Sequence, residues 1–357
     1  MRAVILVGGE GTRLRPLTYA TPKQMLPILG RPMLEWVFAN LRTHGVTDVT
    51  LSLGYLPDAF VEAYPEGSLA GVGLNYAVEP ERLDTAGAIK FAAEYAGINE
   101  TFVVLNGDVL TDLNLTSLMA FHRSHGAAAT LALHEVEDPS AFGVVPTDNE
   151  GRVLAFIEKP RREDAPTRCI NAGTYVFEPS VLDLIASGRK VSVERETFPE
   201  LVAEGSLYAM PGDCYWIDAG TPEAFLRAHY DLLDGTRNAI PPSWATHQND
   251  AWLEEGAVVL GSVTDASYVS KDSVVEERAL VSKSMLCEGS TIASGARVTN
   301  SVVMAGATIS AGAVIDRSII GPGATIGQNA RVEDLSVVGS DVAVGAGELL
   351  SGVRLPI

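Results

Sequence analysis

The chain has 357 residues and a formal net charge of −19, from 45 acidic and 26 basic side chains. This acidic balance argues against nonspecific binding to nucleic acid or to an anionic membrane, because both need a basic surface. No apolar run reaches the roughly 18 residues of a membrane-spanning helix, and the first residues do not resemble a signal peptide. Three scattered cysteines without a CxxC pair argue against a disulfide framework or a zinc site and favour a reducing, cytoplasmic compartment.

The first part of the chain alternates strand-like and helix-like segments. Apolar runs predict strands at 2–7, 49–53, 74–78 and 102–105. Helical periodicity predicts helices at 33–44, 58–63 and 85–95, and a last helix at 222–233. This order is typical of a largely parallel sheet covered by helices, which binds ligands at the carboxyl ends of its strands. The segment 127–177 is richer in strands.

A repeat begins after residue 252. Serines recur at a step of 17, from Ser267 to Ser284, Ser301 and Ser318, and then at a step of 18 to Ser336. Aliphatic residues return about every six positions, as in Val303, Ile309 and Ile315. Three short strands per turn, each with one inward aliphatic side chain, build a coil around an apolar column. The spacing resembles the left-handed parallel β-helix and leaves a β-sandwich as the weaker interpretation.

The change of pattern predicts two domains. We expect an α/β domain over residues 1–234, a linker over 235–252 and a β-helix over 253–357. Many left-handed β-helices are acyltransferases that use a histidine as base, but the last histidine here is His247, before the repeat, so no acetyl transfer is predicted. The stacked coil favours a homo-oligomer, dimeric or trimeric, through the β-helix.

Positive charge is concentrated near the first predicted loop. This acidic chain places Arg2, Arg13, Arg15 and Lys23 there, opposed only by Glu10. A local positive site in a negative protein suggests an anionic ligand, and the alternative is a solvated basic loop.

The loop itself is rich in glycine. Gly8, Gly9 and Gly11 follow the first strand, and Arg13 and Lys23 come soon after. A dinucleotide fingerprint fits badly, because its third glycine is missing and a proline follows. A P-loop would need the lysine directly after its last glycine. The remaining interpretation is a loop whose amides wrap a nucleotide phosphate, with the arginine forking onto phosphate oxygens and the lysine as a mobile charge.

Together with later residues, the loop resembles the signature of the sugar-1-phosphate nucleotidylyltransferases. The matching residues are Gly8-Gly9-x-Gly11-Thr12-Arg13-Leu14-x-Pro16-Leu17-Thr18 and Pro22-Lys23. Further landmarks of that family follow in order: Asn106-Gly107-Asp108, Phe142-Gly143-Val144-Val145, Phe156-Ile157-Glu158-Lys159-Pro160, Asn171-Ala172-Gly173-Thr174-Tyr175 and Trp216-Ile217-Asp218-Ala219-Gly220-Thr221-Pro222. The resemblance covers nearly the whole chain, since a C-terminal left-handed β-helix is also common in the family.

The resemblance implies a Rossmann-like, mixed-sheet nucleotidyltransferase domain that joins a nucleoside triphosphate to a hexose 1-phosphate and releases pyrophosphate. It implies three catalytic cations, Arg13, Lys23 and Lys159. The nucleotide would contact Leu6, Gly8, Gly9, Gly11, Thr12, Arg13, Lys23, Thr85, Gly87 and Asn106. The sugar phosphate would contact Gly143, Glu158, Lys159, Asn171 and Gly173. Asp108 and Asp218 would bind Mg²⁺, whose preferred ligands are carboxylate and phosphate oxygens.

Each of these assignments has a structural alternative. The two aspartates could serve turns or helix caps, Gly173 could mark a bulge in a strand, and Glu158 with Lys159 could form a surface turn. No Ser, Cys or His nucleophile is required, because the attacking phosphate oxygen is already anionic.

Three stretches favour one branch of the family, the mannose-1-phosphate guanylyltransferases. They are Arg13-Leu14-Arg15-Pro16-Leu17-Thr18, Leu83-Asp84-Thr85-Ala86-Gly87 and the run from Val191 to Pro199. That branch usually has glycine where Asp84 stands, so glucose-1-phosphate thymidylyl- or adenylyltransferase remains an alternative. A non-catalytic regulatory homologue is disfavoured, because the three basic residues and both aspartates persist.

Overall fold

The computed structural model describes residues 1–237 and 244–356. The chain divides into two compact units, which are treated separately below. The first unit comprises Met1–Gly9 and Leu34–Trp216, and the second comprises Glu10–Met33 and Ile217–Ile357. The predicted glycine loop is therefore divided between them. Residues 238–243 of the predicted linker, and Ile357 of the predicted β-helix, lie outside the described residues.

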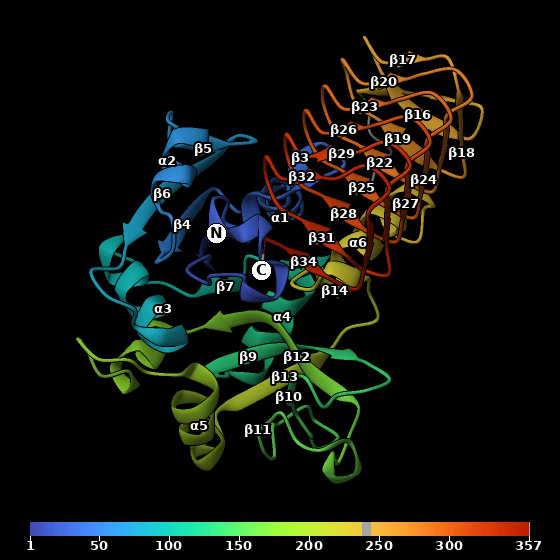
Figure 1. Cartoon of the computed structure of the whole chain (residues 1–357). Helices are drawn as coiled ribbons and strands as arrows, with labels where there is room; N and C mark the ends of the chain where they lie inside the picture. Colours follow the sequence, from blue (N-terminus) through green and yellow to red (C-terminus); the bar gives the residue numbers. More distant parts are fainter. Residues whose placement is uncertain (238–243, 357) are drawn as a thin grey trace. The chain divides into compact units, whose positions relative to one another are not determined.

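The first unit is built on a ten-stranded mixed sheet (Figure 1). Eight strands follow the order β11-β10-β12-β7-β1-β4-β6-β5, and β9 pairs with β12 and with the tenth strand, β13. The four predicted strands are parallel neighbours: β1 (Arg2–Leu6), β4 (Asp48–Leu53), β6 (Val72–Val78) and β7 (Phe102–Asn106). The remaining strands are β5 (Ser68–Leu69), β9 (Ala129–Glu135), β10 (Gly143–Val144), β11 (Ile157–Glu158), β12 (Cys169–Phe177) and β13 (Leu207–Pro211). The sheet becomes antiparallel where β12 joins β7, which makes it mixed as predicted.

The helices of the described residues are α1 (Met33–Thr43), α2 (Asp58–Ala63), α3 (Asp84–Tyr95), α4 (Leu115–His125), α5 (Phe198–Glu204) and α6 (Pro222–Leu233). Of these, α1, α2, α3 and α6 lie close to their predicted positions, whereas α4 and α5 were not predicted. Local chemistry sets their ends: Asn114 caps α4 by accepting a hydrogen bond from the Ser117 amide, and Gly126 ends the helix in a left-handed conformation. The short turns are η1 (Thr12–Leu14), η2 (Leu17–Tyr19), η3 (Lys23–Met25), η4 (Arg162–Asp164), η5 (Pro179–Leu184) and the π-helical η6 (Val193–Thr197).

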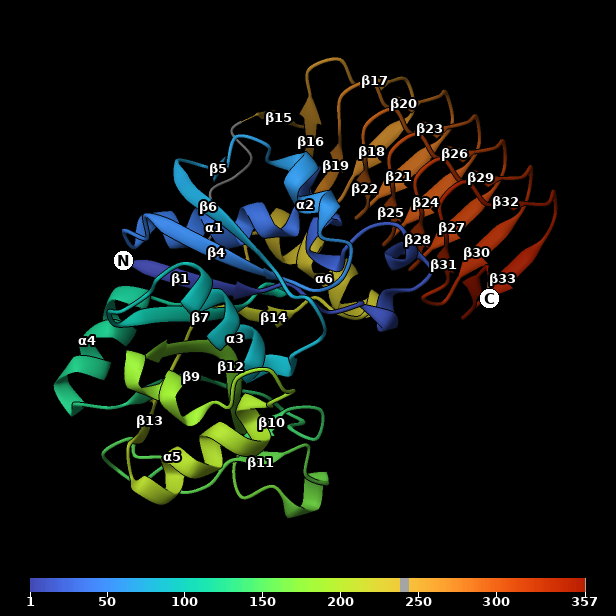
Figure 2. The same cartoon turned by 90° about the vertical axis from the view of Figure 1, so that its left-hand side faces the viewer.

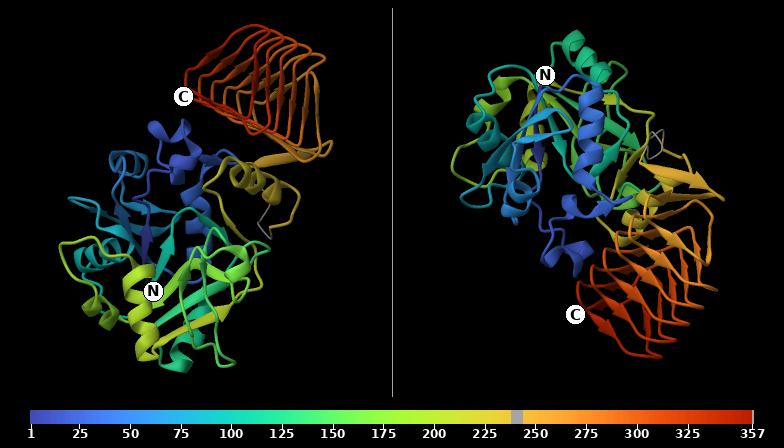
Figure 3. Two further views of the ribbon diagram at one scale, coloured as in Figure 1. Left: turned by 60° about the horizontal axis from the view of Figure 1, so that its bottom comes forward. Right: turned by 90° about the horizontal axis from the view of Figure 1, so that it is seen from above.

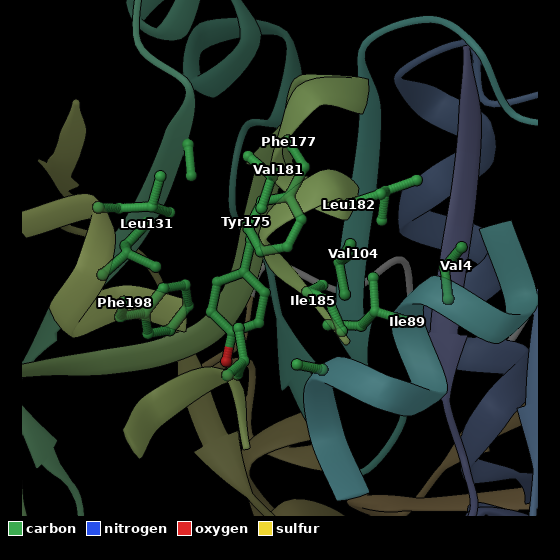
Figure 4. Close-up of a cluster of buried hydrophobic side chains, with 14 of the residues drawn as sticks. Val4, Ile89, Val104, Leu131, Tyr175, Phe177, Val181, Leu182, Ile185 and Phe198 are labelled. Atoms are coloured by element: carbon green, nitrogen blue, oxygen red, sulfur yellow. The ribbon is translucent and has the colours of Figure 1, made fainter. Parts of the chain in front are cut away.

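Aromatic side chains fill the core of the first unit beneath β12 (Figure 4). Tyr175, Phe177 and Phe198 are fully buried. The Tyr175 ring lies 5.8 Å from Phe177 and 5.3 Å from Phe198, centroid to centroid. Such packing fixes the Tyr175 ring, and with it the neighbouring residues of β12 that the sequence assigns to the sugar site.

The second unit contains a left-handed parallel β-helix made of three strand rows (Figure 2). The first row is β15 (Ala245–Gln248), β16 (Ala251–Glu254), β19 (Ser267–Val269), β22 (Met285–Leu286), β25 (Val302–Val303), β28 (Ile319–Ile320), β31 (Val337–Val338) and β34 (Arg354–Leu355). The second is β17 (Val258–Val259), β20 (Val274–Val275), β23 (Thr291–Ile292), β26 (Thr308–Ile309), β29 (Thr325–Ile326) and β32 (Ala343–Val344). The third is β18 (Ser262–Thr264), β21 (Leu280–Ser282), β24 (Arg297–Thr299), β27 (Val314–Asp316), β30 (Arg331–Glu333) and β33 (Leu349–Ser351).

The repeat of the sequence is the pitch of this coil, whose turns stack one on another (Figure 3). Val303, Ile309 and Ile315 point into the column and are fully buried. Burying one such side chain is worth about 1.5–3 kcal/mol relative to exposure. Among the other described strands, β2 (Pro27–Ile28) pairs with β3 (Arg31–Pro32) in the second unit, and β8 (Val109–Thr111) and β14 (Trp216–Asp218) are short; at the end of the coil, β15 pairs antiparallel with β16.

The repeated serines form a hydrogen-bonded ladder inside the coil. The amides of Ser284, Ser301 and Ser318 each donate to the hydroxyl oxygen of the serine one turn earlier, at 3.0–3.1 Å. The amide of Ser336 instead donates to Glu333 O, because the extra residue of the 18-residue step moves it out of register. The serine hydroxyls therefore act as hydrogen-bond acceptors for buried backbone amides that lie outside the strands.

Candidate active site

In the first unit, the glycine loop starts where β1 ends at Leu6. A Cβ atom on Gly8 would come within 3.2 Å of the Gly54 amide nitrogen. The main chain after β1 thus packs against the main chain after β4, which explains the need for glycine at this position. Gly9, the next residue, is exposed.

In the second unit, the rest of the loop folds tightly on itself. Gly11 has a φ of +61°, and a Cβ there would lie 3.0 Å from Thr18 Cγ2 and 3.1 Å from Lys23 Cβ. The Thr18 hydroxyl donates to Gly11 O at 2.9 Å. Thr12 is exposed at the start of η1, and Lys23 begins η3. The predicted residues Gly11, Thr12 and Lys23 are therefore held on one short, braced segment.

The basic residues near the loop do not all belong to one cluster. Arg13 pairs with Asp218, and Arg15 pairs with Glu10 at 2.6 Å. Arg2 belongs elsewhere: it begins β1, the end of the strand away from the loop, and its guanidinium donates to Gly97 O at 3.1 Å. The expected local concentration of charge is thus correct for Arg13, Arg15 and Lys23 and wrong for Arg2.

Asp218 is held from two sides within the second unit. Its Oδ1 accepts a hydrogen bond from the Gly220 amide at 2.9 Å, while its Oδ2 lies 3.2 Å from Arg13 Nη2. A Cβ on Gly220 would come 2.6 Å from that same Nη2, so a larger residue here would require the arginine to shift. Thr221 then caps α6 by accepting from the Ala224 amide. Asp218 serves a turn, as the structural alternative proposed, and also carries the charge that holds Arg13.

The sugar-side residues of the first unit gather around a bulge in β12. Gly173 has a φ of +72°, and a Cβ there would lie 2.7 Å from Asn106 Nδ2 at the end of β7. The Asn171 side chain accepts from the Gly173 amide at 3.0 Å and donates to the Tyr175 hydroxyl at 2.9 Å. The bulge lies between Asn171 and Tyr175, so the alternative interpretation of Gly173 as a strand bulge is confirmed, while its contact with the sugar stays a prediction.

Glu158 and Lys159 end β11 beside this group. Glu158 lies opposite Gly143 in the β10–β11 pair, where a Cβ on Gly143 would come 3.2 Å from the Glu158 carboxylate. Lys159 has a φ of +49°, its side chain is 62% exposed, and its Nζ lies 3.4 Å from Glu158 Oε1. An exposed cation next to a half-buried carboxylate can receive an anionic ligand with little rearrangement.

The buried Tyr175 hydroxyl lies at the centre of the first-unit residues. Burial raises the pKa of this phenol far above its usual value, and the carboxylates of Glu194, Glu158 and Asp108 raise the pKa further. The Tyr175 hydroxyl therefore stays neutral. The run that contains Glu194 was noted in the sequence, but Glu194 itself was not assigned to the site.

Thr85 and Gly87 have well-defined roles within the protein. The Thr85 hydroxyl donates to Glu194 Oε2 at 2.7 Å and accepts from the Val193 amide at 2.8 Å. A Cβ on Gly87 would come 3.2 Å from Arg189 O, and the Gly87 amide donates to Val191 O. Both residues fasten the first turn of α3 to the segment that leads into η6, and their contact with a nucleotide stays a prediction.

Asp108 and Asp218 have the donor chemistry of a magnesium site. Among the described residues, no three His, Cys, Asp or Glu side chains gather closely enough to hold a metal ion by themselves. Carboxylate oxygens are ligands that Mg²⁺ prefers, together with substrate phosphates and water, so each aspartate has fitting donor chemistry. Asp108 belongs to the first unit and Asp218 to the second, so their joint binding of a metal stays a prediction. In the part of the chain that the structure describes, no helix is long and apolar enough to cross a membrane.

Comparison with known proteins adds to this geometry. Residues 2–235 match the family model described as nucleotidyl transferase, and residues 263–355 match the one described as GMPPB C-terminal domain. This chain belongs to the nucleotidyl transferase family. Its enzymes transfer a nucleotidyl group to a sugar 1-phosphate, and the chain is a sugar-1-phosphate nucleotidylyltransferase by this membership.

Two curated relatives of this nucleotidyl transferase show its position within the family. It is 47% identical to a mannose-1-phosphate guanylyltransferase of Mycobacterium tuberculosis over 72% of this chain and 71% of that one. It is 38% identical to a UTP–glucose-1-phosphate uridylyltransferase of Synechocystis, over 65% and 63% of the two chains. Among solved structures, HddC from Yersinia pseudotuberculosis complexed with GMP-PN matches with a TM-score of 0.55 and 30% identity, over 64% of this chain and 97% of that one.

Proposed function

We propose that this enzyme joins GTP to mannose 1-phosphate, giving GDP-mannose and pyrophosphate. The observation that carries this choice is the 47% identity to the mycobacterial mannose-1-phosphate guanylyltransferase over more than two thirds of each chain. The match of residues 263–355 to the GMPPB C-terminal domain supports it from the other end of the chain. The predicted contacts of Leu6, Gly8, Gly9, Gly11 and Thr12 with the nucleotide belong to this proposal.

The proposed reaction is a displacement at the α-phosphorus of the nucleotide. A phosphate oxygen of the sugar 1-phosphate attacks, a new P–O bond forms, and the bond to the bridging oxygen breaks as pyrophosphate leaves. The protein contributes position and charge. Lys159 binds the phosphate of the sugar, while Arg13 and Lys23 balance the charge of the departing pyrophosphate.

The proposed metal ion is Mg²⁺. Asp108 and Asp218 would hold it, and when bound it supplies charge neutralisation on the phosphate oxygens. Because Arg13 is paired with Asp218 in this structure, the guanidinium must turn from the aspartate toward phosphate when substrate binds. That movement would free the Asp218 carboxylate to hold the metal.

The test is pyrophosphate release over a matrix of five nucleoside triphosphates and several hexose 1-phosphates, each with and without Mg²⁺. GTP with mannose 1-phosphate should give the highest kcat/KM. A clear preference for UTP and glucose 1-phosphate would favour the second candidate, which the 38% identity to the Synechocystis uridylyltransferase supports. A preference for dTTP or ATP with glucose 1-phosphate would overturn both, and no turnover with any pair would favour a non-catalytic homologue.

We further propose that the enzyme is cytoplasmic and forms homo-oligomers through its β-helix. Its three cysteines are all unpaired, which fits a reducing compartment. On the coil, Val258, Leu260 and Leu349 are large apolar side chains with exposed fractions of 46%, 63% and 62%. The mass of the full chain in solution tests the oligomer, and a monomer at micromolar concentration would contradict it.

A further inference from the structure

We infer that Glu194 is a second carboxylate of the sugar subsite, which accepts a hydrogen bond from a hydroxyl of the hexose and links the sugar to the first turn of α3. This inference rests on the proposed function, because it assigns a residue to the sugar 1-phosphate that the proposed reaction uses. Every residue that carries it lies in the first unit.

The first step is the position of Glu194. It is partly exposed, whereas Val193 before it is buried, and both belong to the π-helical turn η6. A π-helical turn is rare and occurs frequently at functional sites, because the wider turn re-aims the side chains that follow. The turn leads directly into Phe198, whose ring lies 5.3 Å from that of Tyr175, and the Tyr175 hydroxyl is hydrogen-bonded by Asn171. The Glu194 and Glu158 carboxylates both raise the pKa of that phenol, in line with this arrangement. Glu158 and Asn171 are the residues that the sequence independently assigns to the sugar.

The second step is the way in which the carboxylate is held. The hydroxyls of Thr85 and Ser192 both donate to Glu194 Oε2, each at 2.7 Å. All hydrogen bonds of Glu194 within the described residues end on that oxygen, which leaves Oε1 as an acceptor. A side chain fixed through one oxygen and offering the other is preorganised for a ligand that donates.

The third step is the chemistry of the ligand. Ionised carboxylates only accept hydrogen bonds, and a hexose offers several hydroxyl donors. Glu194 and Glu158 repel a phosphate, whereas Lys159 attracts one. A sugar 1-phosphate is therefore bound in one direction, with its ring hydroxyls at the two glutamates and its phosphate at the lysine.

The fourth step is the link to the nucleotide side. The Thr85 hydroxyl bridges the Glu194 carboxylate and the Val193 amide, and the amides of Ala86 and Gly87 donate to Val191 O. The first turn of α3, where the sequence assigns Thr85 and Gly87 to the nucleotide, is thus fastened to the residue that would accept the sugar. Glu194 thus determines specificity through its own contact with the hexose, and it positions the first turn of α3 through its hydrogen bond with Thr85.

The test is Glu194→Gln in the full-length enzyme, assayed with the sugar 1-phosphate that the wild type prefers. The glutamine carbonyl can still accept from Thr85 and Ser192, but the group facing the ligand becomes an N–H donor. We expect KM for the sugar 1-phosphate to rise at least about 10-fold, the range for losing a hydrogen bond to a charged group, while KM for the nucleotide changes less than about twofold. Glu196→Gln is the matched control: Glu196 lies on the same turn, is exposed and pairs with Arg189 at 2.7 Å. It should behave like the wild type.

A set of deoxy analogues of the same sugar 1-phosphate separates a contact from a structural role. The wild type should lose activity with the analogue that lacks the contacted hydroxyl. With that analogue, Glu194→Gln should lower activity by less than about twofold relative to the wild type. An equal rise of both KM values, or a Glu194→Gln penalty that is the same for every analogue, overturns the inference. If the wild type synthesises the nucleotide sugar and Glu194→Gln is indistinguishable from it, the inference alone fails. If the wild type uses no sugar 1-phosphate, the proposed function fails first.

Discussion

Arg13 and Asp218 form an ion pair in which Nη2 of the arginine lies 3.2 Å from Oδ2 of the aspartate. The Arg13 side chain is 56% exposed, so the pair lies in water and contributes little to stability, in the usual range of about 0–1 kcal/mol. Two residues that are 205 positions apart in sequence are nevertheless joined in the same unit. We therefore explain this ion pair by the ligands that its two members would bind, and not by a contribution to the stability of the fold.

The first prediction separates these two roles. Arg13→Gln should lower the free energy of unfolding by less than about 1 kcal/mol, because the lost pair is exposed. It should lower kcat/KM by at least about 100-fold, because a fixed charge on the leaving pyrophosphate is removed. Chemical denaturation and pyrophosphate release measure the two quantities. Arg15→Gln, which breaks the neighbouring pair with Glu10, is the control for a general loss of loop charge, and an equal effect of both variants on kcat/KM would contradict the assignment.

The second prediction concerns the bulge of β12. Gly173→Ala should cost about 1–3 kcal/mol, because an L-residue is strained at φ +72° and its Cβ would overlap the Asn106 amide. Activity should fall with it, since Asn106 must move. Gly126→Ala is the matched control: its φ is +57°, and its Cβ would meet nothing within 4 Å. It should cost about 1–2 kcal/mol and leave kcat/KM unchanged. Thermal unfolding and steady-state assays of both variants decide the matter.

The third prediction is a pH dependence of stability from His229 in α6. Burial lowers the pKa of this fully buried imidazole to about 4. The unfolded chain binds the proton near pH 6.5, so between pH 6.5 and 4 the unfolded state holds more protons and stability falls as pH falls. The contribution is complete above pH 6.5 and amounts to about 3 kcal/mol lost by pH 4. In His229→Leu this part of the pH dependence should vanish. The free energy of unfolding is measured by urea denaturation from pH 7 to 4. If it changes with pH equally in both proteins, another group is responsible.

The fourth prediction uses the serine ladder. Ser301→Ala leaves the buried Ser318 amide without its acceptor, since that amide donates to Ser301 Oγ at 3.0 Å. The expected cost is about 1–3 kcal/mol. Ser351→Ala, at an exposed position where the hydroxyl donates to Asp334, should cost less than about 0.5 kcal/mol. Circular dichroism during thermal unfolding compares the two, and equal midpoints would show that the ladder adds nothing.

The parts of the fold that could be predicted are those with a strong period. The β-helix was predictable because Val303, Ile309 and Ile315 repeat the same environment, and the parallel strands because each is a short buried apolar run. Helices α2 and α6 begin and end at the predicted residues. A proline at the start of each marks where the helix begins. The domain boundaries stay a prediction, and part of the linker lies outside the described residues.

The candidate site was predictable where a local motif sets the backbone, as at the β12 bulge of Gly173. It was not predictable where a side chain takes its partner from a distant segment. Arg2 lies near the loop in sequence, but a strand separates the two. Glu194 is 109 residues from Thr85, its hydrogen-bond partner, and no local pattern marks it. Positions such as these are set by tertiary contacts, which composition and periodicity do not contain.

The ladder of Ser267, Ser284, Ser301 and Ser318 also bears on how the coil loses its structure. Each turn is hydrogen-bonded only to the turns before and after it, so the coil behaves as a row of coupled neighbours that opens from its ends. The step to Ser336 omits one rung, which makes the final turns the weaker end of the row. Amide protons near Val303 and Ile309 should consequently exchange with deuterium more slowly than those near Val338 and Val344, although both pairs lie in the same buried column.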